Sequence, residues 1–166
     1  MAVLQIAADR PGSGKTSLAG ALLLHLVSVN KRAAYYKPLS QLGENDPDGH
    51  FFSQSLLADN SLQPAPYSSA LPQAGTALDG ALSTQVQAQV NQLKGQADAV
   101  LLEGPGLGNT DGTSSSLPVE LATATDSRVV AVFWYSKTLT ADSVAGACQP
   151  LGDRLAGVLI NGVTAY

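Results

Sequence analysis

The residues with the clearest chemistry lie near the start of the chain, in the stretch IAADRPGSGKTSLAGALLLHLV. An apolar run leads into Gly12-Ser13-Gly14-Lys15-Thr16, and leucines at four-residue spacing then indicate a helix. A glycine-rich turn between a strand and a helix presents backbone N–H groups to a phosphate, and the helix N-terminus adds its positive dipole end. Lys15 is predicted to contact the β- and γ-phosphates of a nucleotide, and the Thr16 hydroxyl to hold Mg²⁺. The predicted cofactor-binding residues of this loop are Gly12, Ser13, Gly14, Lys15, Thr16 and Ser17.

One position departs from the usual phosphate-loop pattern, which is G-x-x-x-x-G-K-[ST]. The place of its first glycine is taken by Asp9. A glycine-rich turn that binds no nucleotide is therefore the alternative interpretation. The apolar strand before the loop and the apolar helix after it favour an atypical loop that still binds ATP with Mg²⁺.

Two charged residues end apolar runs elsewhere in the chain. Lys37 precedes Pro38, so it belongs to the end of a strand rather than to a continuing helix and is expected to point into the crevice there. Glu103 ends the run DAVLLEG, where a carboxylate is costly unless it meets a cation or a metal. Gly104 and Gly106 then allow close backbone approach. A solvated strand end for Lys37 and a helix cap or structural ion pair for Glu103 are the alternatives.

Five near-continuous apolar runs imply the elements that must position these groups, at residues 3–8, 33–39, 98–104, 128–136 and 156–162. Such runs are typical of strands buried on both faces of a parallel sheet. Helical patterns cover residues 83–95 and also 140–155, where Thr140 is the expected cap and Pro150 a break. The alternation predicts an α/β fold, namely a three-layer α/β/α sandwich with a mainly parallel sheet of about five strands.

Residues 41–83 do not fit this alternation, because they are rich in Gly, Pro, Asp, Ser and Gln. A structureless loop of that length is unusual inside a compact domain. We therefore expect one short helix over DGHFFSQSLL, residues 48–57, followed by an irregular excursion on the substrate side of the site. A single nucleotide-binding domain is expected to span residues 1–166.

The opening stretch resembles the dethiobiotin synthetase-like families of P-loop proteins, which include dethiobiotin synthetase, the cobyrinic acid a,c-diamide synthases and the N-terminal domain of long phosphotransacetylases. Three further segments carry the resemblance in the same order. YYKPLSQ resembles the Tyr-Lys-Pro segment that ends the second strand, VLLEGPG the Glu-Gly-Ala-Gly segment, and GVLINGV the Gly-Val-Ile-x-Asn strand near the adenine site. Together the four segments extend from residue 3 to about residue 163, and they imply a P-loop NTPase fold.

The resemblance also implies roles for single residues. Lys15, Lys37 and Glu103 would be the catalytic residues, with Lys37 contacting the γ-phosphate or a substrate carboxylate. Asn161 would face the base, although it could equally be a turn residue before Gly162.

The metal ligands implied by the resemblance are oxygen donors. Thr16 and Glu103 would be joined by Asp46 or Asp48 as a second carboxylate, in a segment most similar to the phosphotransacetylase-type domains. Ordinary turn chemistry is the alternative for these two aspartates. Ser40 is a candidate substrate contact.

Two functions remain open on this basis. One is an ATP-dependent ligase that activates a carboxylate or carbamate, with a small carboxylate or amine as second substrate. The other is a nucleotide-sensing regulatory module whose output goes to a partner protein. Dethiobiotin synthetase-like chains normally continue for some tens of residues beyond the Asn-bearing strand. The base pocket is therefore expected to be open, completed by a partner subunit in a homodimer or larger complex, or missing because the sequence is a fragment.

Composition excludes several other classes of protein. The 166 residues are 45% hydrophobic and 13% charged with a net charge of −4, which disfavours nucleic-acid and anionic-membrane surfaces. No apolar run approaches the roughly 20 residues of a membrane span, and no secretory signal is recognisable, so a cytoplasmic location is expected. Cys148, the single cysteine, is expected in the core on a helix, and Trp134 in the core at a strand end. His25 and His50 have no partner at metal-ligand spacing, which argues against a zinc site.

Overall fold

The computed structural model describes residues 1–40, 46–52, 78–108 and 114–163. The elements in chain order are β1 (Ala2–Ala8), α1 (Lys15–Ser28), β2 (Ala33–Tyr36), α2 (Pro47–Phe51), α3 (Gly80–Lys94), β3 (Ala99–Gly106), α4 (Leu117–Thr125), β4 (Arg128–Trp134), α5 (Ala141–Cys148), the 3₁₀ helix η3 (Gln149–Arg154) and β5 (Leu155–Asn161). Strands and helices therefore alternate along most of the described chain.

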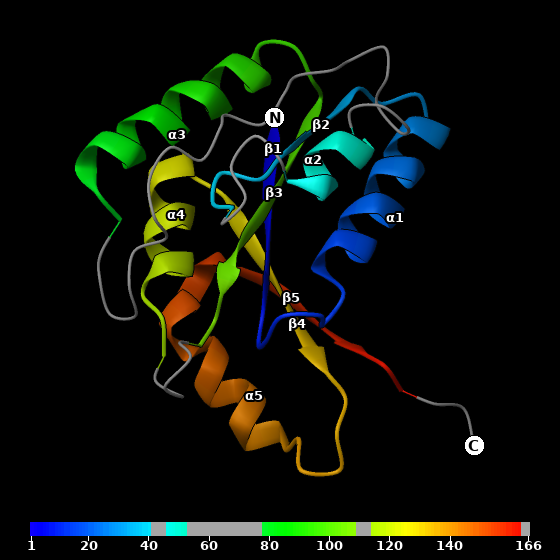
Figure 1. Ribbon diagram of the computed structural model, residues 1–166, viewed down its shortest axis with the longest axis vertical. Coiled ribbons are helices and arrows are strands. Elements are labelled where there is room, and N and C mark those ends of the chain that lie inside the picture. The colour runs from blue at the N-terminus through cyan, green and yellow to red at the C-terminus, as the bar shows by residue number, and fades with distance from the viewer. Residues whose placement is uncertain (41–45, 53–77, 109–113, 164–166) are drawn as a thin grey trace.

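The five strands form one parallel sheet in the order β2-β3-β1-β4-β5. The central strand β1 pairs with β3 on one side and β4 on the other, so that Leu4 lies opposite both Leu101 and Arg128. Helices α1 and α2 cover one face of the sheet, and α3, α4 and α5 cover the other (Figure 1). The predicted α/β/α sandwich with a parallel sheet of about five strands is confirmed.

This topology places the end of β1 between the ends of two neighbouring strands. The chain leaves β1 at Ala8 and enters α1 at Lys15, so the glycine-rich loop joins the centre of the sheet to the helix that covers it. Glu103 lies near the end of β3, directly beside β1 in the register that pairs Ile6 with Glu103. Parallel strands open their ligand crevice at this edge.

One helix was not predicted. Residues 117–125 form α4, with a proline in its first turn, and the helix ends at Asp126, which has a positive φ of 50°. The segment is short and rich in alanine and threonine, and its large apolar residues at helical spacing are limited to one pair, Leu117 and Leu121. Pro118 suits a first helical turn because its missing N–H has no partner there in any case.

Other boundaries differ by a few residues from the predictions. Helix α3 begins at Gly80 rather than residue 83, because Asp79 caps it by accepting a hydrogen bond from the Ala81 N–H. Helix α2 occupies Pro47–Phe51 instead of residues 48–57, of which 53–57 lie outside the described residues. The break at Pro150 is confirmed: α5 ends at Cys148 and the chain continues as η3.

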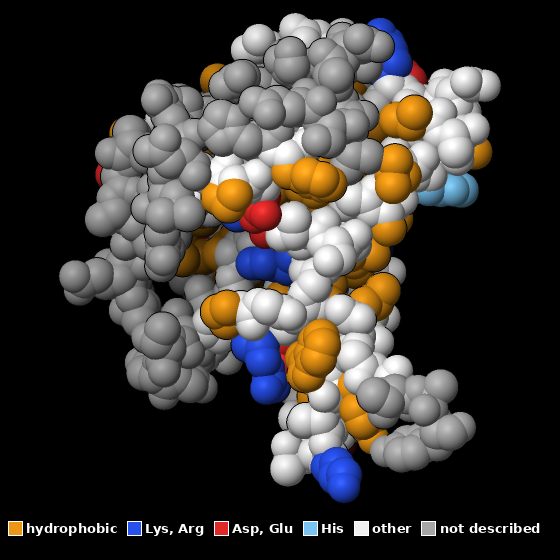
Figure 2. Space-filling model, turned by 45° about the vertical axis from the view of Figure 1, so that its right-hand side comes forward, with side chains coloured by type: hydrophobic (Ala, Val, Ile, Leu, Met, Phe, Trp, Pro, Cys, Tyr) orange, Lys and Arg blue, Asp and Glu red, His pale blue; other side chains and the backbone are white. Residues whose placement is uncertain are grey.

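The prediction for Trp134 was wrong. This side chain is 41% exposed because β4 ends here at the rim of the sheet, whereas Cys148 is buried as expected. Figure 2 shows hydrophobic side chains in separate groups on one face of the molecule. No helix in the described part of the chain combines the length and apolar character needed to cross a bilayer.

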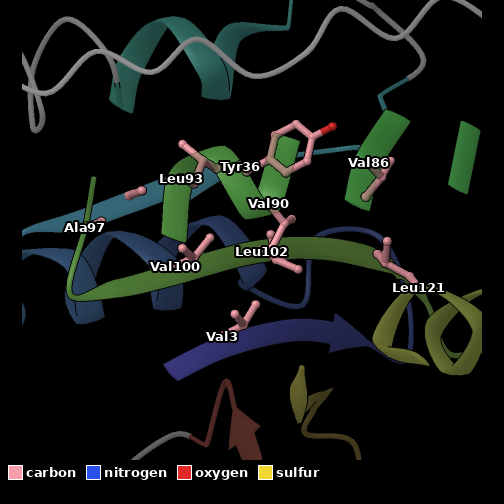
Figure 3. Close-up of a cluster of buried hydrophobic side chains, with 10 residues drawn as sticks. Val3, Tyr36, Val86, Val90, Leu93, Ala97, Val100, Leu102 and Leu121 are labelled. Carbon is pink, nitrogen blue, oxygen red and sulfur yellow. The ribbon is translucent and has the colours of Figure 1, made fainter. Parts of the chain in front are cut away.

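The core lies in two layers, one on each face of the sheet. Figure 3 shows part of the layer beneath α3 and α4, which contains Val3, Ala34, Tyr36, Val86, Val90, Leu93, Ala97, Val100, Leu102 and Leu121. On the opposite face, Ile6, Ala8 and Leu23 pack between the sheet and α1. Successive residues of β1 and β2 thus enter different layers, which explains their near-continuous apolar sequence.

Candidate functional site: a phosphate loop beside a carboxylate cluster

A cavity of about 590 Å³ opens at the carboxyl ends of β1 and β3, a volume within the usual range for small-molecule sites. On the face of the molecule drawn in Figure 2, acidic (red) and basic (blue) side chains lie next to one another at the surface. The residues lining the cavity are Pro11, Gly12, Ser13, Gly14, Lys15, Thr16, Ser17, Lys37, Leu39, Ser40, Asp46, Asp48, Glu103, Gly104, Pro105 and Gly106. All predicted site residues except Asn161 are among them.

The loop itself has the backbone geometry that its glycines allow. Gly12 and Gly14 have φ values of +78° and +97°, which residues with a Cβ rarely adopt. Helix α1 begins directly after Gly14, and its first residues line the cavity, so the N-terminal N–H groups of the helix lie beside it. The loop therefore combines a glycine-rich turn with a helix N-terminus, as phosphate binding requires.

Asp9 fixes this loop to the sheet. Its Oδ1 accepts hydrogen bonds from the Ser13 hydroxyl at 2.5 Å and from the Trp134 N–H at 3.2 Å, while Oδ2 lies 2.7 Å from the Arg10 guanidinium. The carboxylate in place of the usual glycine thus ties the middle of the loop to the end of β4. Sequence reasoning noted the departure at Asp9 without finding this role.

Asn161, at the end of β5, supports the loop from outside the cavity. Its Nδ2 donates to the Ser13 carbonyl at 3.0 Å, and its Oδ1 accepts from the Gly162 N–H at 2.8 Å. A Cβ on Gly14 would lie only 2.4 Å from that Nδ2. Asn161 does not line the cavity described above, and its contact with a base stays a prediction.

Lys15 extends from the loop towards β3. Its Nζ donates to the Gly104 carbonyl at 3.0 Å. Burial lowers the pKa of Lys15, the Glu103 carboxylate opposes that change, and the neighbouring Lys37 adds to it. An ammonium in these surroundings has little water around it, so a bound anion would interact with it strongly.

Lys37 lies among three carboxylates. Its Nζ is 2.9 Å from Asp46 Oδ2, 2.5 Å from Asp48 Oδ2 and 3.8 Å from Glu103 Oε1. Burial alone would lower the pKa of Lys37, but the hydrogen bonds to Asp48 and Asp46 and the field of Glu103 outweigh it and raise the pKa. The predicted strand-end lysine and the predicted carboxylates therefore meet in one cluster.

Asp46 is held at several points. Burial would raise its pKa, but hydrogen bonds from the Ser40 hydroxyl and from Lys37 outweigh that effect and lower it. Its Oδ1 also accepts from the Asp48 N–H at 2.9 Å. Ser40 thus contacts a carboxylate of the cluster, and its contact with a substrate stays a prediction.

The Thr16 hydroxyl reaches the same cluster from the loop. Its Oγ1 lies 3.4 Å from Asp48 Oδ2 and 3.3 Å from Glu103 Oε1. Oxygen donors of this kind suit Mg²⁺, which usually combines one or two carboxylates with phosphate oxygens and water. Across the described ranges, no three Asp, Glu, His or Cys side chains form a metal site by themselves. These residues therefore fit a Mg²⁺ ion that is shared with a nucleotide rather than one caged by protein alone.

Tyr35 is a member of the site that sequence reasoning missed. Its hydroxyl donates to Glu103 Oε2 at 2.9 Å, and the residue is 3% exposed. Burial and the adjacent Glu103 carboxylate raise the pKa of the Tyr35 phenol well above its usual range, so the group stays a hydrogen-bond donor. A tyrosine inside an apolar run has the pattern of a core residue. The sequence carries no signal that distinguishes a tyrosine buried only in the core from one whose hydroxyl contacts the site.

A family model described as an AAA domain matches residues 3–166. The chain belongs to this family. With its loop and its parallel sheet, this AAA-domain chain has the fold of the P-loop NTPases. No curated protein sequence matches it.

Solved structures with the same fold include proteins of different kinds. The BceF tyrosine kinase domain is 22% identical with a TM-score of 0.61, covering 98% of this chain and 69% of its own. The MinC:MinD cell division protein complex of Aquifex aeolicus is 16% identical with a TM-score of 0.62, covering 99% and 70%. A putative plasmid partition protein of Borrelia burgdorferi B31, bound to AMPPNP, is 12% identical with a TM-score of 0.59, covering 99% and 77%. At these identities the likeness concerns the fold.

Proposed function

We propose that this AAA-domain protein binds ATP with Mg²⁺, with the phosphates over residues 12–16 and the metal beside Thr16, Glu103 and Asp48. The observation that carries the proposal is the meeting of Lys15, Thr16 and Glu103 around one cavity at the end of β1. Lys15 and Thr16 are adjacent at the start of α1, whereas Glu103 comes from β3, and each offers what a metal-bound triphosphate needs. When bound, Mg²⁺ would neutralise phosphate charge and polarise the phosphoryl group.

The first experiment is a calorimetric titration of the protein with ATP and Mg²⁺. Lys15→Ala should weaken binding by roughly 10- to 100-fold, since a hydrogen bond to a charged group contributes about 1.5–3 kcal/mol. Lys94→Ala, which removes a lysine from the end of α3, is the matched control for the lost charge. Absence of binding at millimolar nucleotide by the folded protein would contradict the proposal.

For the reaction, the proposal is activation of a small carboxylate or carbamate by phosphoryl transfer, as in the dethiobiotin synthetase-like ligases. Lys37 supports it, because its ammonium lies among the carboxylates and lines the same cavity as the phosphate loop, where it could stabilise charge on the transferred group. Lys15 would hold the β- and γ-phosphates. Glu103 would orient the Thr16 hydroxyl and share the metal.

This reaction is tested by phosphate release from ATP, with and without diaminononanoate and bicarbonate. Lys37→Ala and Glu103→Gln should lower turnover more than nucleotide affinity, because both residues act near the transferring phosphoryl group rather than the base. Nucleotide binding without substrate-stimulated hydrolysis would reject the ligase reaction.

A second candidate function is a nucleotide-dependent regulatory module. One observation favours it: Asn161 joins the phosphate loop to β5, one of the two outer strands of the sheet, through its bond to the Ser13 carbonyl. A change in the loop on nucleotide binding would thus reach a strand whose Val158 and Ile160 are nearly half exposed. Hydrogen exchange of β5 amides with and without MgATP separates this candidate from the ligase, because only the module requires protection of β5 to change.

A further inference from the structure

Two adjacent tyrosines of β2 have different surroundings. Tyr36 faces the layer beneath α3, where it packs with Val90 and Leu102 (Figure 3). Tyr35 faces the opposite side, among the residues that pack against α1, and its hydroxyl enters the carboxylate cluster. The pair therefore offers one tyrosine at the site and one matched tyrosine away from it.

The Tyr35 hydroxyl contacts one oxygen of the Glu103 carboxylate. It donates to Oε2 at 2.9 Å, while Oε1 lies 3.3 Å from Thr16 Oγ1 and 3.8 Å from Lys37 Nζ. A carboxylate is planar, so fixing one oxygen restricts the direction of the other. Glu103 is 4% exposed, and little water is available to replace the phenol as a donor.

The Tyr35 ring contacts the segment that carries the other carboxylates. Its centroid is 4.0 Å from that of Phe52, at an interplanar angle of 41°, and Phe52 is 1% exposed. Phe52 follows α2, and Asp48 lies in the first turn of this helix. A single side chain thus touches Glu103 through its hydroxyl and, through its ring, packs against Phe52, four residues after Asp48.

We propose that Tyr35 is a positioning residue of the metal–nucleotide site, which aims Glu103 Oε1 at Thr16 and keeps the acidic segment against it. The inference rests on the proposed binding of ATP with Mg²⁺ and adds a residue to that site. Tyr35 itself touches neither the metal nor the phosphates. Groups that orient metal ligands in this way typically change metal affinity by about 10- to 100-fold when removed.

The test is the Mg²⁺ dependence of nucleotide binding, measured by titrating protein and ATP at a series of Mg²⁺ concentrations. Tyr35→Phe keeps the ring against Phe52 and removes only the hydroxyl. This substitution should raise, by about tenfold or more, the Mg²⁺ concentration that gives half-maximal enhancement of ATP binding. The affinity for ATP without metal should be unchanged. Tyr36→Phe, the matched control, should bind as the wild type does.

A double-mutant cycle separates orientation of Glu103 from a general structural effect. In a Glu103→Ala background, Tyr35→Phe should cause no further change in Mg²⁺ dependence, because its partner is already missing. Tyr35→Phe values equal to the wild type, or an equal loss in both backgrounds, would overturn the inference while leaving ATP binding intact. Wild-type protein without Mg²⁺-enhanced ATP binding would instead overturn the proposed function and the inference together.

If Tyr35→Phe does not fold, Phe52→Leu tests the ring contact instead. This variant should also raise the Mg²⁺ concentration required for enhanced ATP binding, and an unchanged Mg²⁺ requirement would count against the inference.

Discussion

At the scale of residues, the site is a balance of charges at short distances. Asp46, Asp48 and Glu103 surround the Lys37 ammonium. Lys15 lies nearby and donates a hydrogen bond to the Gly104 carbonyl of β3. Carboxylate groups outnumber ammonium groups here. The cluster can therefore accept a further cation, and the phosphate loop beside it can accept an anion.

Asp46 should contribute to stability in a pH-dependent way. Its pKa is lowered in the folded protein, so its contribution is present above the unfolded value of about 3.9 and is lost as the pH falls through the folded value. We expect the wild type to be more stable than Asp46→Asn near pH 7, and the difference to shrink below about pH 4. Urea unfolding of both proteins across this pH range measures the difference in their free energies of unfolding. A difference that stays constant with pH would contradict the prediction.

Gly14 should be the least tolerant glycine of the loop. Gly14→Ala combines a φ of +97° with a Cβ placed 2.4 Å from Asn161 Nδ2, whereas a Cβ on Gly12, at +78°, meets no atom within 4 Å. We expect each substitution to cost roughly 1–3 kcal/mol in backbone strain, with a further loss for Gly14→Ala alone. In urea unfolding, Asn161→Ala should recover part of that extra loss; strictly additive effects would contradict the clash.

At the scale of elements, the helix that begins at the site differs from α5 in how its first turn is capped. Helix α1 has no side-chain cap and begins at a left-handed glycine, which leaves its first N–H groups for a ligand. Helix α5, away from the loop, has a full capping box between Thr140 and Ser143. The contrast fits a binding role at one helix start and a structural role at the other.

The α5 cap gives a stability prediction. Thr140→Ala should lower the free energy of unfolding by about 1 kcal/mol, and Tm by roughly 2–4 °C, because the Ser143 N–H loses its acceptor. Thr140→Ser keeps the hydroxyl and should retain most of the stability. Thermal unfolding followed by circular dichroism compares the three proteins, and equal Tm values would show that the cap is unimportant.

The elements that sequence predicted best were the strands, for a physical reason. Strands buried on both faces need apolar residues at nearly every position, and β1 and β4 have them. Helix α4 was missed because it is short and packs through small residues around Leu121. Its local signals, Pro118 in the first turn and the spacing of Leu117 and Leu121, cover too few residues to outweigh the polar sequence before them.

The site was predictable to the extent that its residues are strand ends and loop glycines. Lys37 and Glu103 stood out because a charge ending an apolar run is costly without a partner. Which partner each meets depends on strand order, and β2 and β3 become neighbours only in the folded sheet. The contact between Tyr35 and Glu103 follows from that pairing, so it was beyond reach of the sequence.

At the scale of the whole molecule, the two layers of the core enclose a sheet in which the outer strand β5 is only half covered, with Val158 and Ile160 nearly half exposed. Tyr135, Leu139, Val144, Cys148 and Ile160 line a second cavity, of about 440 Å³, between α5 and β5. Cys148, one of these lining residues, is 6% exposed. Its thiol can therefore report whether α5 stays packed on the sheet.

Cys148 should react slowly with iodoacetamide in the folded protein. Burial raises the pKa of the thiol, and the thiolate is the reactive form, so the rate at neutral pH should be well below that of free glutathione and should increase with pH. Protein in guanidinium chloride is the control, because its single cysteine is then exposed. Mass spectrometry follows the labelling; equal rates in folded and unfolded protein would contradict the packing of α5.

The bond between Asn161 and Ser13 joins residues 148 positions apart, and Lys15 meets Gly104 across 89 positions. Because synthesis runs from the N-terminus, the glycine-rich loop is made before β3 and β5. Contacts of such long range form late, because the intervening chain must close first. A nascent chain therefore carries this loop without these two contacts until β3 and β5 have been made and have joined the sheet.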